Sequence, residues 1–430
     1  HGRDRRQRQM CIRDRNEISI IEAVKILRSK NRNIAFIDIR KRQKYVQGFA
    51  FGSINCEVAK LNHHLLDLVP NTKTTILFIG VENETNKKKI FKVLNKFSFK
   101  NYFTIRGDYN EWIKNRLPFW KGEYTFSKAF GEWVEKSSNI KNIFPDELKK
   151  IHKKNNFFQI DTRPKSEFEK FTLPFSHHCS GGELPIFLNN NLNTKKTYIV
   201  HCAGRTRSII AYQTLKDFNF RNKKLVLNGG TQNWVLSGYE RVYNNKSKLN
   251  KTKINLVKDL NLSKEISKKF KIPASFKRVH DPDNYFFQIN SEIKNFQNIK
   301  GWRNLNATTL IQNTDKFIAS TLSKIFVYSF VPSSSLFSVI WLRRMGYNAI
   351  WQVKKPRSVN RRYQPIKIDP TYFFPKRHLG NKNHSRGYLN WEHSLIPTIN
   401  RWGCRYPWIS ANNFNLKNPE NIIYKVYRNF

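Results

Sequence analysis

The sequence predicts an α/β protein made of successive units, each a parallel β-sheet with helices on both faces. Its 430 residues are too many for one ordinary core, since domains usually run to roughly 100–200 residues. The run Phe157–Asp161 (FFQID) returns as Phe286–Asn290 (FFQIN), and Ala35–Asp38 (AFID) has the same character. Short apolar runs that end in a polar residue are typical of buried parallel strands. We therefore expect three tandem repeats.

A second buried strand and then a helix follow each of these runs. The strands are expected at Thr75–Ile79, Thr197–Val200 and Lys324–Tyr328, and the helices at Lys88–Phe97, Arg207–Phe218 and Leu336–Met345. A glycine turn and a tryptophan come next in the first two repeats, as Gly107 with Trp112 and Gly229 with Trp234. Parallel strands need crossover connections, which are usually helical, so helices should cover both faces of each sheet.

The repeats give the chain a predicted domain plan. Its parts are a leader at 1–15, units at 16–120, 144–243 and 262–355, and a candidate fourth unit, truncated, at 380–430. The leader is almost entirely charged or polar, so we interpret it as non-native or disordered sequence outside the fold. The polar stretches Gly122–Ile143 and Asn244–Lys271 suit linkers or connecting helices. Within Asn415–Tyr427, the apolar run Ile422–Tyr424 predicts the start of a fourth-unit strand.

The charge of the chain is strongly positive. It carries 78 Lys and Arg against 31 Asp and Glu, a formal net charge of +47. Such an excess would indicate a nucleic-acid-binding domain if it were confined to one face or tail. Lys, Asn, Ile and Phe are frequent in every segment, however, which favours a compositional bias over a specific nucleic-acid surface. We expect only weak attraction to polyanions at low salt.

The cysteines and histidines indicate neither a disulfide framework nor a metal site. The five cysteines, Cys11, Cys56, Cys179, Cys202 and Cys404, are scattered and lack C-x-x-C spacing. This usage fits the reducing cytoplasm. The pairs His63-His64 and His177-His178 are adjacent, so their side chains diverge, and we interpret them as surface or loop histidines. No run reaches ~18 consecutive apolar residues, so no membrane span is expected. The sequence predicts no cofactor and no metal.

One cysteine lies where a ligand site is expected. Cys202 ends a predicted strand and is followed by Ala203, Gly204, Arg205, Thr206, Arg207, Ser208 and a predicted helix. Ligands of parallel sheets bind at the carboxyl ends of strands. Successive backbone N–H groups in such a loop can converge on an anion, and the helix N-terminus adds positive potential, so both favour a thiolate nucleophile. The equivalent corners, near Ile79 and Val331, hold no cysteine.

Several motifs resemble successive landmarks of one rhodanese domain over residues 144–243. They are Asp161-Thr162-Arg163, Gly181-Gly182-Glu183-Leu184, the loop C-A-G-R-T-R-S, and N-G-G-x-x-x-W-x-x-x-G-Y at Asn228–Tyr239. The first repeat keeps Asp38-Ile39-Arg40 and a stretch at Gly48–Asn55 similar to the G-H-I-P-G-A-x-N of that family, but Gly80-Val81-Glu82 stands at its loop. The arrangement, with Arg386–Arg401 similar to the opening of another repeat, resembles bacterial multidomain rhodanese-related sulfurtransferases.

The resemblance implies a sulfurtransferase with one working site. Cys202 would carry a persulfide, and residues 203–208 would bind a small anionic donor such as thiosulfate, which Arg205 and Arg207 would favour. The acceptor would be a thiol, a protein or cyanide. The first and third units would be inactive and serve as scaffolding or in partner recognition. Asp161, Arg163 and Trp234 would be structural, and His201 a packing residue at the strand end.

Other interpretations stay open. A non-catalytic sensor or docking protein is the main alternative, and an inert buried Cys202 is a further one. A Cys-dependent phosphatase is less favoured, because its H-C-x-x-x-x-x-R signature needs an arginine where Ser208 stands. Cys179 would be a resolving thiol or, more simply, an incidental cysteine.

Overall fold

The structure is a computed structural model of the chain. It describes residues 16–154, 156–190, 196–243, 245, 255–277, 279–291, 296–320, 322–365, 370–404 and 406–430. The predicted leader and Cys11 lie outside these residues.

The first unit contains a five-stranded parallel sheet. Its strand order is β1 (Glu17–Ile18), β6 (Tyr102–Ile105), β5 (Thr75–Ile79), β2 (Ile34–Asp38) and β4 (Ile54–Asn55). Its helices are α2 (Ile20–Leu27), α3 (Arg42–Gln47), α4 (Leu61–Leu68), α5 (Glu84–Lys96) and α6 (Tyr109–Lys114). β3 (Phe49–Ala50) and β7 (Phe119–Trp120) form a separate antiparallel pair. The two central strands are buried along their whole length, as their unbroken apolar runs require.

The second unit repeats this arrangement. Its sheet runs β8 (Asn142–Ile143), β13 (Lys224–Leu227), β12 (Thr197–His201), β9 (Phe157–Asp161) and β11 (Ser176–His178). Its helices are α7 (Thr125–Ser138), α8 (Pro145–Ile151), α9 (Lys165–Lys170), η1 (Gly181–Glu183), α10 (Leu184–Asn190), α11 (Thr206–Asp217) and α12 (Gly230–Leu236). β10 (Phe171–Thr172) and β14 (Val242–Tyr243) form its antiparallel pair.

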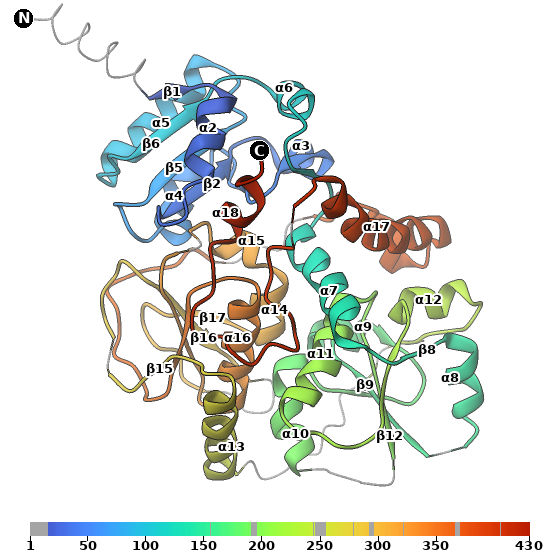
Figure 1. The fold of residues 1–430 in the computed structure, drawn as a ribbon. Helices are drawn as coiled ribbons and strands as arrows, with labels where there is room; N and C mark the ends of the chain where they lie inside the picture. The colour runs from blue at the N-terminus through green and yellow to red at the C-terminus, as the bar shows by residue number, and fades with distance from the viewer. Residues whose placement is uncertain are drawn as a thin grey trace, which may run out of the picture.

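The third unit has the same strand order again. Its sheet runs β15 (Ala274–Ser275), β19 (Ala349–Gln352), β18 (Ile325–Tyr328), β16 (Tyr285–Ile289) and β17 (Arg303–Leu305). Its helices are α13 (Leu256–Lys269), α14 (Ala307–Gln312), α15 (Thr314–Phe317) and α16 (Pro332–Arg344). Three parallel five-stranded sheets with flanking helices confirm the predicted fold class (Figure 1). β8 begins at Asn142, ahead of the start at residue 144 that was predicted for the second unit. The predicted domain boundaries remain a proposal.

The three units pack against one another through a shared apolar core and are not separate domains joined by linkers. A single cluster of buried apolar side chains draws residues from all three units and from the C-terminal segment. The indole N–H of Trp341 in α16 donates to Thr214 Oγ1 in α11 at 2.9 Å, and Arg344 forms a buried ion pair with Asp217 at 2.6 Å. The two predicted linker regions contain α7 and α13, and α7 is largely buried between the units.

The C-terminal segment is helical where a strand was predicted. It contains η2 (Pro375–Leu379), α17 (Lys382–Arg401) and α18 (Ile422–Tyr427). The strand predicted within Asn415–Tyr427 was therefore wrong. Asn421 caps α18 by accepting hydrogen bonds from the N–H groups of Ile423 and Tyr424. The apolar residues of α18 then face the core at helical spacing, and the Tyr427 hydroxyl donates to Phe51 O at 2.8 Å.

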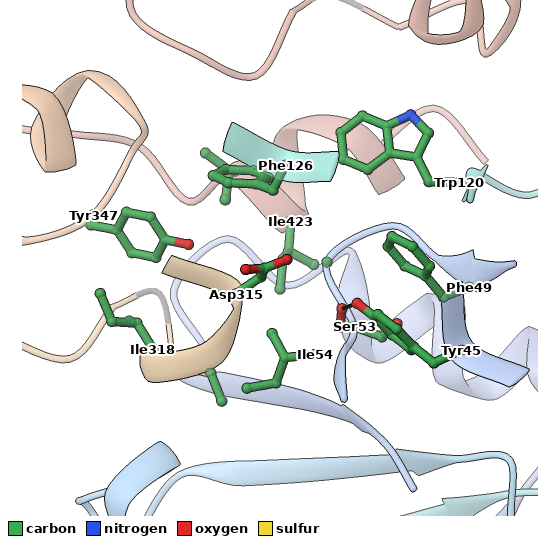
Figure 2. Close-up of a pocket in the computed structure, with 13 residues that line it drawn as sticks. Tyr45, Phe49, Ser53, Ile54, Trp120, Phe126, Asp315, Ile318, Tyr347 and Ile423 are labelled. Atoms are coloured by element: carbon green, nitrogen blue, oxygen red, sulfur yellow. Dashed lines mark hydrogen bonds between the residues drawn. The ribbon is translucent and has the colours of Figure 1, made fainter. Parts of the chain in front are cut away.

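A small cavity lies where α18, the first unit and the third unit meet. It has a volume of about 30 Å³, and most of its lining is apolar (Figure 2). The carboxylate of Asp315 in α15 projects into it beside Ile54 and Ile423. Across the described residues, no helix is both long and apolar enough to span a membrane.

Candidate active site

The cysteine loop joins β12 to α11 at the carboxyl end of the second sheet. Cys202 follows the last residue of β12, and α11 begins at Thr206. The N-terminus of α12 packs against the loop, because Thr231 N donates to Cys202 O at 2.9 Å and Gln232 N donates to Ala203 O at 3.0 Å. In a trans peptide the N–H points opposite to the C=O of the same unit, so the N–H groups of Ala203 and Gly204 face away from α12.

The inner side of the loop is a set of free hydrogen-bond donors. The backbone N–H groups of residues 203–208 have no protein acceptor among the described residues. The hydroxyl of Thr206 also lacks a partner there and is buried. Buried N–H groups are almost always satisfied in native proteins, so this run of donors calls for an anion or water. It is the donor arrangement that the sequence predicted for the loop.

Gly230 in α12 holds the loop and helix in close contact. Its φ is +54°, and a Cβ added there would lie 2.2 Å from Cys202 O and 2.7 Å from Gly204 O. Only glycine satisfies both conditions without displacing the loop. The N-G-G sequence at Asn228–Gly230 thus has a direct structural purpose, since its second glycine fixes the loop geometry.

Cys202 lies at the bottom of the loop with 1% of its surface exposed. Its Sγ is 3.5 Å from the hydroxyl of Ser208, and that hydroxyl is 2.8 Å from Arg205 O. Ser208 therefore bridges the thiol and the loop backbone. It occupies the position at which a Cys-dependent phosphatase would need its arginine.

The two loop arginines are paired with glutamates. Arg205 donates from Nε to Glu132 Oε1 at 2.7 Å and from Nη2 to Glu132 Oε2 at 3.1 Å, and it also contacts Glu135; both carboxylates belong to α7. Arg207 donates to both carboxylate oxygens of Glu167 in α9, at 2.6 and 3.0 Å. Although burial opposes its charge, Glu167 raises the pKa of Arg207. An oxyanion would thus have to displace Glu167 to form a bidentate pair with Arg207.

Helix α17 covers the open side of the loop. Glu392 and Tyr388 approach Gly204 so closely that an added Cβ would lie 2.8 Å from Glu392 Oε2 and 3.2 Å from Tyr388 Cε1. Glu392 is fully buried; its Oε1 pairs with Lys128 at 2.9 Å and accepts from Tyr388 at 2.9 Å. Its Oε2 has no hydrogen-bond partner in the described part of the chain and faces the loop. Figure 1 shows α17 lying beside α7 and α12.

The remaining residues predicted for the site are Asp161, Arg163 and Trp234, which make buried contacts in the same unit as the loop. Asp161 accepts from Arg163 through both carboxylate oxygens, at 3.0–3.1 Å from Nε and 2.7 Å from Nη2, and from Thr172 Oγ1 at 2.7 Å. Burial opposes the charge of Asp161, but Arg163 outweighs it and holds the pKa of Asp161 well below its usual range. Trp234 is fully buried and donates to Glu240 O at 2.8 Å. The structural role of all three residues stays a prediction.

His201 and Cys179 are also buried near the loop. Burial lowers the pKa of His201 to about 4, so the ring is neutral at pH 7, and its Nε2 lies 2.8 Å from Ser176 Oγ. This agrees with the packing role predicted for His201. Cys179 is fully buried within the shared core and directly follows β11.

Sequence reasoning missed the glutamates and Lys128 that surround the loop. Glu132, Glu135, Glu167 and Glu392 come from three helices, and α7 lies in a stretch predicted to be a linker or a connecting helix. The sequence offers one indirect signal, which is that acidic residues are rare. The chain has only 31 of them, and four lie around this loop. Nothing in their local sequence indicates that they meet.

A comparison with known families decides the classification of this unit. The family model of the rhodanese-like domain matches residues 144–237. This part of the second unit is therefore similar to rhodanese-like domains. The matched residues begin directly after β8 and contain the remaining strands of the second sheet, the cysteine loop and α12.

Solved structures extend the likeness to the other units at the level of fold. The thiosulfate sulfurtransferase of Pseudomonas aeruginosa matches with a TM-score of 0.75 at 15% identity, over 90% of this chain and 98% of that one. A rhodanese-related protein of Thermoplasma volcanium matches 24% of the chain at 25% identity, covering 97% of its own length, with a TM-score of 0.21. A rhodanese-like domain protein of Staphylococcus aureus matches 22% at 27% identity, covering 91% of its own length, with a TM-score of 0.20. No curated protein sequence matches the chain.

Proposed function

We propose that this protein is a sulfurtransferase that carries sulfur as a persulfide on Cys202. The observation that carries the proposal is the run of N–H donors at residues 203–208, which find no protein acceptor in the described part of the chain, around a cysteine at the end of a parallel strand. Such donors stabilise the negative charge that a persulfide or an attached oxyanion brings. The match of residues 144–237 to the rhodanese-like domain supports the proposal, as does the fold that this chain shares with the thiosulfate sulfurtransferase of Pseudomonas aeruginosa.

The proposed reaction has two balanced steps. The Cys202 thiolate attacks the outer sulfur of thiosulfate; a new S–S bond forms, the old one breaks, and sulfite leaves with its electron pair. A nucleophilic acceptor then attacks the terminal sulfur of the persulfide. The Cys202–sulfur bond breaks, the thiolate is restored, and the sulfur leaves on the acceptor, as thiocyanate when the acceptor is cyanide or as a persulfide when it is a thiol.

The loop backbone, not the arginine side chains, receives the anionic donor in this proposal. Arg205 and Arg207 are each held by a glutamate, so their proposed role is to fix the loop and balance the surrounding carboxylates. Glu167 keeps 36% of its side chain exposed, which leaves this edge of the site accessible to a small donor. The proposed acceptor remains a thiol, a protein or cyanide, and we propose the cytoplasm as the compartment in which Cys202 stays reduced.

The test is the mass of the protein after incubation with thiosulfate. We expect a gain of one sulfur atom, located in the peptide that contains Cys202, and a stoichiometric release of thiocyanate on adding cyanide. Cys202→Ala should abolish both, whereas Cys179→Ala, the matched control in the same unit, should retain both. A wild-type protein that gains no sulfur would overturn the proposal.

A non-catalytic docking role is the second candidate, and the burial of Cys202 favours it. With 1% of its surface exposed beneath α17, the thiol is closed to a large acceptor in this conformation. Under this alternative neither thiosulfate nor a small persulfide donor would load sulfur on Cys202 in the native protein. Loading that appears only after mild denaturation would support docking over catalysis.

A further inference from the structure

A second polar pocket lies far from Cys202 in the sequence, between the first and third units. Its volume is about 440 Å³. One wall is formed by α3, the loop after β4 and α4 of the first unit; the other is formed by β17, α15 and residues 364–365 of the third. A pocket of this size is in the range that takes small molecules, and such sites often form between domains.

The lining of this pocket is rich in cations. Arg42, Lys60, Arg303 and Lys316 contribute positive charge, and His63 and His64 lie beside them. Glu57 is the acidic residue of the lining, and it is paired with Lys60 at 3.2 Å. Asp67 does not line the pocket, but its carboxylate forms an ion pair with Arg303 at 2.6 Å. Among the residues that line the pocket, four therefore carry a positive charge and one carries a negative charge.

Arg42 gives the strongest indication of a missing ligand. Its side chain is more than nine-tenths buried, yet its guanidinium makes no hydrogen bond to any described residue, and Nε is among the buried atoms without a partner. The guanidinium lies 5.3 Å from the centroid of the Tyr45 ring, and Asp315 and Glu123 balance its charge without a hydrogen bond to it. A buried guanidinium without hydrogen-bonded partners is costly, and an anion that binds in the pocket would remove that cost.

Two further features of the wall favour an anion. The first turn of α4 faces the pocket through Lys60, His63 and His64, and its N-cap, Lys60, provides no side-chain cap. A helix N-terminus carries partial positive charge, and here that charge acts without free donors at Leu61 and His63, whose N–H groups donate to Val58 O and Lys60 O. Cys56 also lines the pocket, but burial raises the pKa of its thiol to about 12, so it adds no negative charge.

The rest of the lining suits an organic body attached to the anionic group. Leu68, Phe317 and Pro365 supply apolar surface within the same lining. The pocket volume also exceeds that of a bare oxyanion, since one water molecule occupies about 30 Å³ of liquid. The two walls come from units that are distant in sequence, so a ligand held by both would join them.

We propose that this pocket binds a small organic anion with a phosphate, sulfate or carboxylate group at Arg42, Arg303 and Lys316. The organic body lies against Phe317, Leu68 and Pro365. Binding is independent of sulfur transfer at Cys202 and stabilises the contact between the first and third units. The pocket serves as a ligand site within a pair of units that the sequence predicts to be catalytically silent.

The experiment uses phenyl phosphate as the probe, with titration calorimetry on the full chain at 150 mM salt. We expect one saturable site, no binding of phenol, and at least a tenfold weaker affinity in Arg42→Gln. Lys316→Gln should weaken binding severalfold. Because Lys316 is less buried than Arg42, this variant keeps the proposal testable if Arg42→Gln does not fold. Lys324→Gln removes an exposed lysine elsewhere in the third unit and should bind like the wild type.

Two outcomes would overturn the proposal. One is the same affinity in wild type, Arg42→Gln and Lys316→Gln, because the cations named would then not hold the probe. The other is several weak equivalents whose affinity falls equally in Lys324→Gln, which would indicate general attraction to a chain of +47. Cys202→Ala should bind the probe as the wild type does, so this test is separate from that of the proposed sulfur transfer.

Discussion

At the residue scale, some ion pairs can be predicted from the sequence and others cannot. Asp161 and Arg163 are two residues apart, and the same pair recurs as Asp38 and Arg40, where Arg40 also donates to Gly48 O. Such local, repeated pairs can be predicted from the motif. Arg205 and Glu132 are 73 residues apart, and Arg207 and Glu167 are 40 apart. Those pairs depend on the packing of α7 and α9, which one sequence does not fix.

Replacing Asp161 tests the structural role of the local pair. Asp161→Asn leaves the buried guanidinium of Arg163 without its carboxylate, and breaking a buried pair in this way costs about 3–5 kcal/mol of unfolding free energy. Because the native pKa of Asp161 is lowered, the stabilisation exists above its unfolded pKa of ~3.9 and is lost as the pH falls toward the native value. The stability difference between variant and wild type should therefore be nearly constant above about pH 5 and shrink below about pH 4, which urea unfolding from acidic to neutral pH measures.

A surface ion pair provides the control for this prediction. Lys165 and Glu169 lie 3.7 Å apart with about half of each side chain exposed, so Glu169→Gln should change stability by less than about 1 kcal/mol. Equal effects of the two substitutions would contradict a structural role for Asp161.

Elements with an unbroken apolar run could be predicted, and elements made by packing could not. Thr75–Ile79 was expected as a strand and is β5, because five consecutive buried residues leave no other pattern. The edge strands β1, β4 and β8 hold two residues each and carry no periodic signal of their own. The Ile422–Tyr424 run was misjudged because its β-branched residues suggested a strand, whereas Ile422, Ile423, Val426 and Tyr427 recur at helical spacing.

The contact between the cysteine loop and α12 can be tested by replacing Gly230. Gly230→Ala places a Cβ against Cys202 O and Gly204 O, so the loop must move and its N–H groups lose their arrangement. We expect at least a tenfold lower rate of sulfur loading on Cys202, with a loss of about 2 kcal/mol or more in stability. Gly238→Ala is the matched control, since Gly238 also has a positive φ of +85° but open space around it. It should cost about 1 kcal/mol and leave loading unchanged. Equal loading rates in the two variants would contradict the role of Gly230.

Helix α17 is expected to control which reagents reach Cys202. The unpaired Oε2 of Glu392 faces the loop, so its charge should repel anions more than neutral molecules of the same size. We predict that Glu392→Gln raises the rate of Cys202 alkylation by iodoacetate relative to iodoacetamide by about fivefold at low salt. Tyr388→Phe, which keeps the carboxylate, should leave the ratio unchanged. Peptide mass spectrometry isolates Cys202 from the other cysteines, and a constant ratio in all three proteins would exclude this influence of Glu392.

At the scale of the whole molecule, the units are joined by contacts that no single repeat contains. Arg303 of the third unit pairs with Asp67 of the first, and Arg344 of the third pairs with Asp217 of the second, both at 2.6 Å. The repeat pattern predicts three similar sheets but says nothing about their mutual placement, because the residues that make these contacts differ between the repeats. The α17 cover and the pocket at Arg42 follow from that placement, so neither could be predicted.

The cavity between the first unit, the third unit and α18 offers a test of how these parts hold together (Figure 2). Asp315 Oδ1 is buried there without a hydrogen-bond partner in the described residues, and burial raises the pKa of this carboxyl despite the nearby Arg42. A raised native pKa means that the charged form opposes folding, so the wild type loses stability as the pH rises from ~4 through the native pKa. We predict that Asp315→Asn is more stable than the wild type by about 1 kcal/mol at pH 8 and that the difference shrinks toward pH 4, where Asp315 becomes neutral. Thermal unfolding across this range measures the difference. A variant less stable at pH 8 would mean that the attraction between Asp315 and Arg42 outweighs the burial of the carboxylate.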